Sequence, residues 1–179
     1  SDPGSIPNAL MVEHYRQRAG AGLILTEATG FSVEGLGWPA APGIWNDAQI
    51  EAWKPVTEAV HKAGGRIMLQ MWHMGRLVHP EFLGGAAPVS ASATTAPGHA
   101  WTPTGRQDYQ MSRALSLDET ERVIDEYSST AQNAKAAGFD GRQLHSAAGY
   151  RIAQFFRDGT SWRGNIYVGP PQTGMPRCL

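Results

Sequence analysis

The hydrophobic positions of the chain repeat at helical spacing in three stretches, at about residues 8–19, 47–63 and 117–137. Apolar residues three or four positions apart line one face of an α-helix. Each stretch stops at an Ala-Gly pair, and glycine is a common signal for the end of a helix. The pattern therefore predicts three amphipathic helices.

Residues at the helix starts support two of these boundaries. Asn46 with Gln49, and Ser116 with Glu119, have the spacing of a capping box, in which side chains bond the first free backbone N–H groups. Pro55 lies inside the second helix and should kink or weaken it, because proline has no N–H to donate.

A short apolar run follows each helix, at residues 23–26, 67–69 and 139–144. Buried strands that alternate with helices indicate a parallel sheet with right-handed crossovers. Two architectures remain at this point, the doubly wound open sheet and the (β/α)₈ barrel.

Polar residues stand at the end of each apolar run: Glu27 after the first, Gln70 and His73 after the second, and His145 after the third. In a barrel enzyme the active site lies at the carboxyl ends of the strands. Strand ends are also polar simply because they meet water.

Composition adds a loop-rich character. The 179 residues include 21 Gly and 12 Pro, above the usual share. The surplus gathers at residues 30–46 and 75–116, and a connection as long as the second is usually functional or disordered. We expect an elaborated loop over the strand ends with a short hairpin of its own.

Several classes of protein are disfavoured by charge and hydropathy. A net charge of −1 does not supply the positive field of a nucleic-acid binder. No apolar run reaches the length of a membrane span, and residues 1–5 do not resemble a secretory signal. The single cysteine, Cys178, suits a reducing cytoplasm, so a cytoplasmic protein is expected.

Two motifs invite other interpretations. Gly35 and Gly37, with Ala40, match the dinucleotide pattern G-x-G-x-x-A, but prolines follow where a helix should open. His73, His79 and His145, with Glu27, could form the zinc site of a metal-dependent barrel hydrolase, although no H-x-x-x-H or H-x-H spacing occurs among them.

Two other groups of residues suit a flat ligand. The Gln70 amide offers a donor and an acceptor to the edge of a heterocycle, and the alternative is a strand end that fills a core with Trp72 and two methionines. His145 and Tyr150 could both donate hydrogen bonds to an oxygen, and Tyr150 could give up a proton. The alternative for this pair is packing in the core.

The chain resembles the Old Yellow Enzyme family of FMN-dependent NAD(P)H oxidoreductases, the ene-reductases. The run GGRIMLQMWHMGR at 64–76 and the run LHSAAGY at 144–150 carry the resemblance most clearly. Shorter matching stretches lie at residues 15–24, 26–29, 42–45, 138–141 and 154–160.

The resemblance implies an FMN-bearing TIM barrel that uses NAD(P)H to reduce the activated C=C bond of α,β-unsaturated carbonyl compounds. Ala28 would contact the flavin through its backbone and Gln70 would bind the pyrimidine edge. His145 would contact the flavin and hold the substrate carbonyl. Tyr150 would protonate the substrate, and Trp38 and Trp72 would line the pocket.

Three departures from the family pattern concern single residues. Ala148 stands where the family places Asn or His as a second donor, and loss of such a donor typically costs about 10²–10³ in rate. Arg142 and Arg151 replace expected small or apolar residues. Arg142 is expected toward the helix layer, where an unpaired charge would be costly.

The resemblance covers only part of a barrel, about three strand–helix units of the eight. It predicts a partial FMN-binding domain over residues 1–163 and a divergent tail over 164–179, in which a frameshift or truncation of the gene would explain the change of character. We expect weak FMN binding, because the phosphate-binding loops of the family are not matched. The alternative is a non-catalytic, pseudogene-like product.

Overall fold

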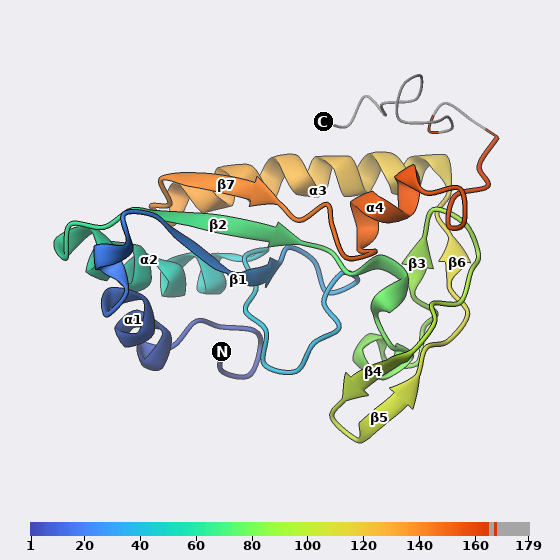
Figure 1. The fold of residues 1–179 in the computed structure, drawn as a ribbon, viewed down its shortest axis with the longest axis horizontal. Coiled ribbons are helices and arrows are strands. Elements are labelled where there is room, and N and C mark those ends of the chain that lie inside the picture. Colours follow the sequence, from blue (N-terminus) through green and yellow to red (C-terminus); the bar gives the residue numbers. More distant parts are fainter. Residues whose placement is uncertain (165–166, 168–179) are drawn as a thin grey trace. The chain divides into compact units, whose positions relative to one another are not determined.

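The computed structural model describes residues 1–164 and residue 167 (Figure 1). The chain forms two compact units. The first unit comprises residues 1–32, 40–72 and 125–144, and the second comprises residues 33–39, 73–124 and the described residues from 145 onward. Most of the predicted tail, 165–166 and 168–179, lies outside the described residues, so the domain boundary at residue 163 stays a prediction.

The first unit contains the helices and strands that the hydrophobic pattern predicts. In chain order they are α1 (Ala9–Arg16), a 3₁₀ turn (Ala19–Ala21), β1 (Ile24–Gly30), α2 (Asp47–Lys62), β2 (Ile67–Trp72), the part of α3 (Leu117–Ala136) from residue 125 onward, and β7 (Gly141–Leu144). The predicted helices are therefore confirmed to within a few residues at each end.

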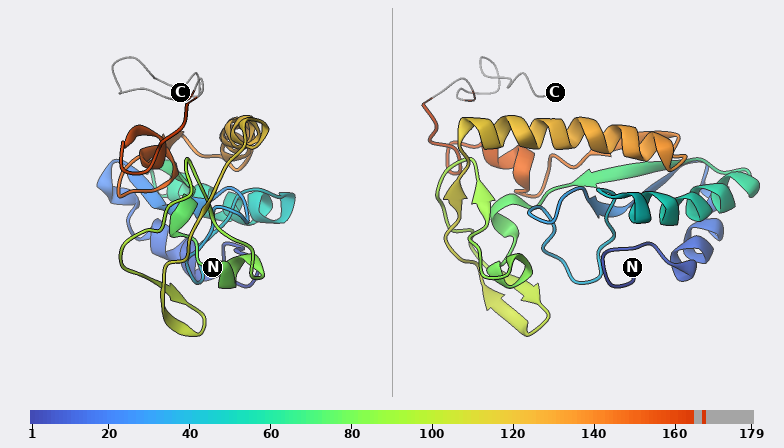
Figure 2. Two further views of the ribbon diagram at one scale, coloured as in Figure 1. Left: turned by 90° about the vertical axis from the view of Figure 1, so that its right-hand side faces the viewer. Right: turned by 180° about the vertical axis from the view of Figure 1, so that it is seen from behind.

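The three strands form one parallel sheet in the order β1–β2–β7 (Figure 1). Parallel neighbours joined by helices confirm the predicted α/β class. The described residues contain these three strands of a barrel and no closed barrel. Figure 2 shows α1 and α2 lying side by side in this unit.

An apolar core fills the space between helices and sheet. Trp53 and Val56 from α2 and Ile67 and Leu69 from β2 are completely buried. The ring of Trp53 packs edge-on against Phe139, with 5.2 Å between ring centroids. These are the positions at which the helical and strand periodicities predicted burial.

The start of α2 is capped as predicted. The side chain of Asn46 accepts a hydrogen bond from the Gln49 N–H at 3.0 Å. The Gln49 amide oxygen accepts from the N–H of Trp45 at 2.8 Å rather than from Asn46, so the reciprocal half of the capping box is made one residue earlier. The helix continues unbroken through Pro55, since its buried face is held by the core.

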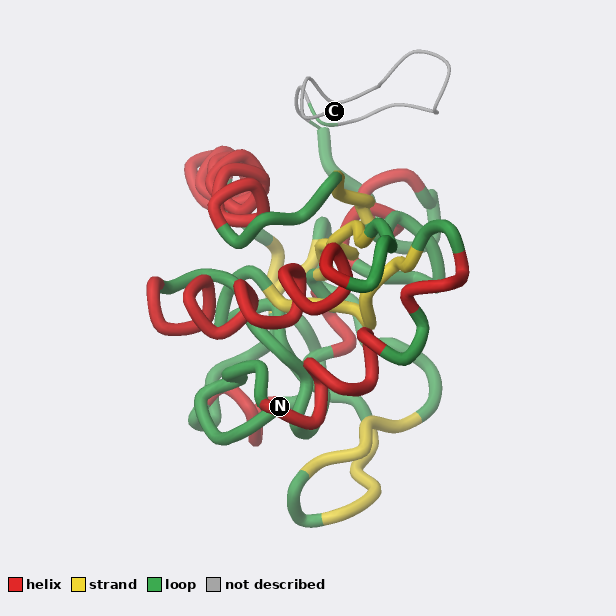
Figure 3. The backbone as a smooth tube through the Cα atoms, turned by 90° about the vertical axis from the view of Figure 1, so that its left-hand side faces the viewer, coloured by secondary structure: helices red, strands yellow, loops and turns green. Residues whose placement is uncertain are grey.

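The second unit is built from short elements and loops. They are two 3₁₀ turns (Gly75–Leu77 and Pro80–Leu83), β3 (Val89–Ser90), β4 (His99–Thr102), β5 (Gly105–Asp108), β6 (Arg113–Ala114), the first residues of α3, and α4 (Arg151–Phe156). β4 and β5 pair as an antiparallel hairpin, seen as two yellow strands joined by a green turn at the bottom of Figure 3. The expected hairpin in the long connection is confirmed.

The capping box at the start of α3 is reciprocal. The Ser116 hydroxyl accepts from the Glu119 N–H at 3.1 Å, and the Glu119 carboxylate accepts from the Ser116 N–H at 2.8 Å. This is the arrangement that the sequence spacing predicted.

Arg142 departs from expectation. It lies on β7 opposite Leu69, yet its side chain is exposed. β7 is an edge strand of the described sheet, and a long charged side chain at an edge reaches water. The expected cost of burying this charge therefore does not arise in the described residues.

Candidate functional site

One extra residue in β1 decides which side chain stands beside Gln70. Leu25 pairs with Met68, but the next pair is Ala28 with Gln70, three residues further on β1 and two on β2. This shift is the signature of a β-bulge, which re-aims the side chains that follow it. Without the bulge Glu27 would occupy the place of Ala28.

The bulge is held by two side-chain hydroxyls. Thr26 Oγ1 accepts a hydrogen bond from the Gln70 N–H at 2.9 Å. The Tyr15 hydroxyl accepts from the Glu27 N–H at 2.9 Å and donates to the Glu27 carboxylate at 3.3 Å. Burial raises the pKa of Tyr15, so the hydroxyl keeps the proton that it donates.

A third strand extends this pairing. Gln143 on β7 is the partner of Gln70 on β2, and Nε2 of Gln70 donates to Oε1 of Gln143 at 2.7 Å. We call Ala28, Gln70 and Gln143 the strand rung. The rung presents one small side chain and two amides, and it contains no charge.

His145 and Tyr150 lie in the second unit, on the turn between β7 and α4. Their rings meet edge to face, with 4.8 Å between centroids and 80° between planes. We call these two residues the donor pair. The structure thus brings together the two residues that the sequence analysis put forward as donors.

The protonation states of the donor pair follow from partial burial. Burial lowers the pKa of His145 and raises the pKa of Tyr150. At neutral pH the imidazole is therefore neutral and the phenol is protonated. Each side chain then has one hydrogen to donate.

The turn of the donor pair is strained at Ala148. Its φ is +56°, followed by +76° at Gly149. Residues with a Cβ rarely adopt this left-handed conformation, whereas asparagine does so several times more often than other residues. The methyl group of Ala148 provides no hydrogen-bond donor, as the sequence indicated.

The two tryptophans predicted to line a pocket differ in exposure. Trp38 lies on the loop before residue 40 and is 48% exposed, whereas Trp72 at the end of β2 is buried. A half-exposed indole is available to a ligand. The pocket roles of both residues remain predictions.

Gln154 is a residue whose importance the sequence analysis missed. It is completely buried in the second unit. Its Nε2 donates to the carbonyls of Met74 (3.0 Å) and Gly149 (2.8 Å). Its Oε1 accepts from the Arg76 N–H and the Ser90 hydroxyl, both at 3.2 Å. One amide therefore joins three segments and holds the turn immediately before Tyr150.

His73 is completely buried. Its Nδ1 accepts from the Gly75 N–H at 3.0 Å, and its Nε2 lies 3.1 Å from Nη2 of Arg151. Burial and the nearby Arg151 charge lower its pKa far below the usual value. The ring also lies against Gly35, where a Cβ would come within 2.6 Å of it. His73 is thus enclosed by protein.

These contacts bear on the two alternative motif interpretations. No helix opens after Gly35 and Gly37, so the context that the dinucleotide pattern requires is missing. In the part of the chain that the structure describes, no three His, Cys, Asp or Glu residues are grouped so as to hold a metal ion. The ring nitrogen Nδ1 of His79 accepts from the Glu81 N–H instead.

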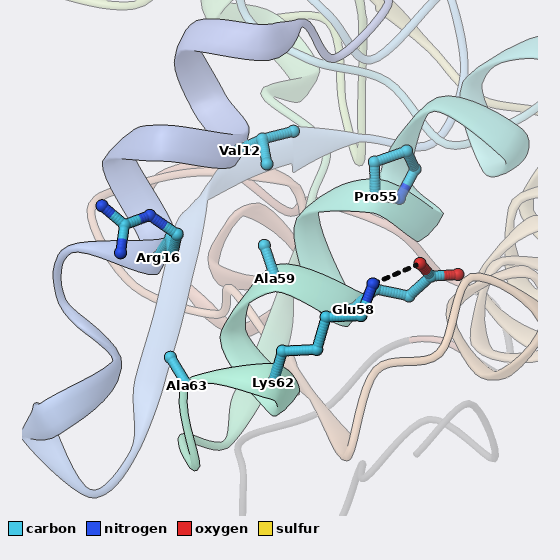
Figure 4. A pocket seen from close by; sticks show the side chains of 7 residues that line it. All are labelled: Val12, Arg16, Pro55, Glu58, Ala59, Lys62 and Ala63. Atoms are coloured by element: carbon cyan, nitrogen blue, oxygen red, sulfur yellow. Dashed lines mark ion pairs between the residues drawn. The ribbon is translucent and has the colours of Figure 1, made fainter.

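The surface of the first unit has a shallow groove between α1 and α2 (Figure 4). Its floor is apolar, with Val12, Pro55 and Ala59. Of the charges at its rim, Lys62 lies 3.7 Å from Glu58. None of the candidate site residues lines this groove, so it adds nothing to the candidate chemistry.

The family comparison matches nearly the whole chain. The model of the NADH:flavin oxidoreductase / NADH oxidase family matches residues 1–174.

Among the described residues, no helix combines the length and the apolar composition that crossing a membrane requires.

Curated relatives agree with this match. The flavin oxidoreductase hxnT of Emericella nidulans is 42% identical over 170 residues, which is 94% of this chain and 44% of that protein. Chanoclavine-I aldehyde reductase fgaOx3 of Penicillium roqueforti is 44% identical over 172 residues, 93% of this chain and 44% of that protein. The chain therefore spans less than half the length of these relatives.

Solved structures show the same fold. The Old Yellow Enzyme homologue from Zymomonas mobilis is 53% identical, with a TM-score of 0.91 over 94% of this chain and 47% of that one. Morphinone reductase is 41% identical, with a TM-score of 0.88 over 93% of this chain and 46% of its own. The chain therefore has the fold of slightly less than half the length of each of these two structures.

Proposed function

The chain belongs to the NADH:flavin oxidoreductase / NADH oxidase family, and we propose that its residues serve an FMN-dependent reduction of activated C=C bonds by NAD(P)H. The substrate class is the α,β-unsaturated carbonyl compounds. The observation that carries the proposal is the donor pair, His145 against Tyr150 with both rings in their hydrogen-donating states.

The strand rung fits the edge of a flavin. Gln70 has an Oε1 atom that makes no hydrogen bond to any described residue, and its Nε2 has a second hydrogen. Such an acceptor beside a donor complements the N–H and C=O groups of a pyrimidine. The small Ala28 side chain lets a flat ring approach the β1 backbone. We therefore assign Ala28 and Gln70 to FMN, with His145 as a further flavin contact.

FMN, when bound, supplies hydride to the β carbon of the alkene. The neutral His145 donates a hydrogen bond to the substrate carbonyl oxygen and stabilises the negative charge that develops there. Tyr150 gives its hydroxyl proton to the α carbon and is reprotonated by solvent. Trp38 and Trp72 are proposed to border the substrate.

A non-catalytic product is the second candidate, and Ala148 favours it. A methyl group replaces the second donor toward the carbonyl oxygen, which typically costs about 10²–10³ in rate. The FMN affinity is also expected to be weak. The two candidates differ in whether the chain turns over any substrate.

The test measures NADPH oxidation with 2-cyclohexenone and added FMN for the wild-type chain, Tyr150→Phe and Ala148→Asn. We expect slow turnover in the wild type, a loss of about 10²-fold or more in Tyr150→Phe, and a gain in Ala148→Asn. FMN binding by fluorescence quenching is measured in parallel. If the wild type and Ala148→Asn bind FMN but neither turns over, the non-catalytic candidate is correct.

A further inference from the structure

The hydrogen bond between Gln70 and Gln143 lies wholly within the first unit, on adjacent strands of one sheet. Nε2 of Gln70 donates to Oε1 of Gln143 at 2.7 Å. The two residues are direct partners in the parallel register of β2 and β7. Gln143 is exposed and Gln70 is half-buried, so this bond sits at a surface of the sheet and not in the core.

This hydrogen bond contributes little to the stability of the fold. A hydrogen bond between two neutral side chains in contact with water contributes little net free energy, because water replaces either partner. Its larger effect is on orientation. A free glutamine amide samples several rotamers and both amide directions, and fixing it costs side-chain entropy.

The direction of the bond determines what Gln70 has left to offer. With one Nε2 hydrogen committed to Gln143, Gln70 retains its Oε1 and one N–H. These form an acceptor beside a donor. If Gln143 donated instead, the Gln70 amide would turn over and present its two N–H groups, with no acceptor toward a ring N–H.

We propose that Gln143 is a positioning residue for flavin recognition. By accepting from Gln70, it sets the Gln70 amide in the orientation whose oxygen receives the N3–H of the flavin. The inference rests on the proposed function, since it deepens the assignment of Gln70 to FMN. On the other neighbouring strand, β1, the partner of Gln70 is Ala28. Its methyl group cannot form a competing hydrogen bond with the Gln70 amide.

The test compares three substitutions at one position. Gln143→Glu keeps only acceptors, Gln143→Lys has only donors, and Gln143→Leu has neither. The wild type and each variant of the 179-residue chain are titrated with FMN and with 3-methyl-FMN, in which the N3–H is replaced by a methyl group. The readout is the ratio of the two dissociation constants, in which the charge introduced at position 143 cancels because both ligands carry the same charge.

We expect 3-methyl-FMN to bind the wild type and Gln143→Glu about 5- to 10-fold more weakly than FMN, as loss of one hydrogen bond predicts. In Gln143→Lys the ratio of dissociation constants should fall to about 1. The ratio for Gln143→Leu should lie between that value and the wild-type ratio. A loss of folding would weaken both ligands equally and leave the ratio unchanged.

The outcomes separate the two claims. FMN binding with the same ratio in all four proteins would overturn the positioning role and leave the proposed function standing. A ratio that falls in Gln143→Glu and persists in Gln143→Lys would also overturn it, because the bond would then run in the other direction. Failure of the wild type to bind FMN at all would overturn both.

Discussion

Different kinds of contact stabilise the interior of each of the two units of this chain. In the first unit the largest completely buried side chains are apolar, among them Trp53, Val56 and Ile67, with Gln49 as the one polar exception. In the second unit the largest buried side chains include His73, Arg151 and Gln154, and hydrogen bonds connect its short elements. The stability of an apolar core depends on how well side-chain volumes fill it. The stability of a polar interior depends on whether each donor meets an acceptor.

This difference explains why the helices and strands of the first unit could be predicted from the sequence, whereas in the second unit only the hairpin of β4 and β5 and the start of α3 could be. Apolar burial is non-directional and leaves a periodic trace along the chain. A buried amide leaves no periodic trace, because its partners are backbone atoms of segments far away in the sequence. The proposed donor pair, and Gln154 which holds the turn before Tyr150, lie in the second unit.

The largest effect is expected in the apolar unit. Trp53→Ala should lower the free energy of unfolding by about 3–5 kcal/mol, since it leaves a cavity against Phe139 and removes the bond from its Nε1 to the Gly43 carbonyl. Denaturant unfolding measures the loss. Trp101→Ala is the matched control, because Trp101 is 52% exposed and its removal should change stability little. Equal losses in the two variants would contradict this account.

The next effect distinguishes polarity from volume. Gln154→Met nearly conserves volume but removes all four hydrogen bonds of the buried amide, and unpaired buried groups are costly. We expect a loss of about 2–3 kcal/mol in the free energy of unfolding. The exposed Gln107, whose amide reaches only Thr104 at 3.4 Å, provides the control as Gln107→Met. A Gln154→Met protein as stable as the wild type would show that the second unit depends on volume after all.

The order of helices and strands in the first unit could be predicted from the sequence, but the strand boundaries and the β-bulge could not. β1 was expected at residues 23–26 but runs from Ile24 to Gly30. The bulge in this strand depends on Tyr15 from another element, and periodicity within a strand contains no information about such a partner. β7 begins at Gly141 rather than at Phe139, because Phe139 belongs to the core beneath the sheet.

The candidate site could be predicted in part. Ala28, Gln70, His145 and Tyr150 came from the family resemblance, and the structure pairs them as Ala28 with Gln70 and His145 with Tyr150. Gln143 could have been noticed as a polar residue near the end of the third apolar run, two residues before His145. Its pairing with Gln70 required the register between strands, which no local pattern gives.

The smallest expected effect tests the polar unit through pH. The Glu119 carboxylate accepts hydrogen bonds from the Arg113 guanidinium at 2.9 Å and from the Ser116 N–H at 2.8 Å. These contacts, the Arg113 bond first, lower the pKa of Glu119 from 4.5 to about 2. A lowered pKa means that the folded state favours the charged carboxylate.

The stabilisation by Glu119 should therefore be complete above about pH 4.5 and should be lost as the pH falls toward 2. The side chain is 30% exposed, so we expect no more than about 1 kcal/mol. The free energy of unfolding is measured from pH 6 to pH 2 for the wild type and for Glu119→Gln, and the difference isolates this carboxylate. It should shrink over that window, whereas the cost of Trp53→Ala should stay constant, because no charge contributes to it. A Glu119→Gln difference that does not change with pH would mean that the capping box is held by geometry rather than by charge, and the contrast between the two units would then be smaller than the structure suggests.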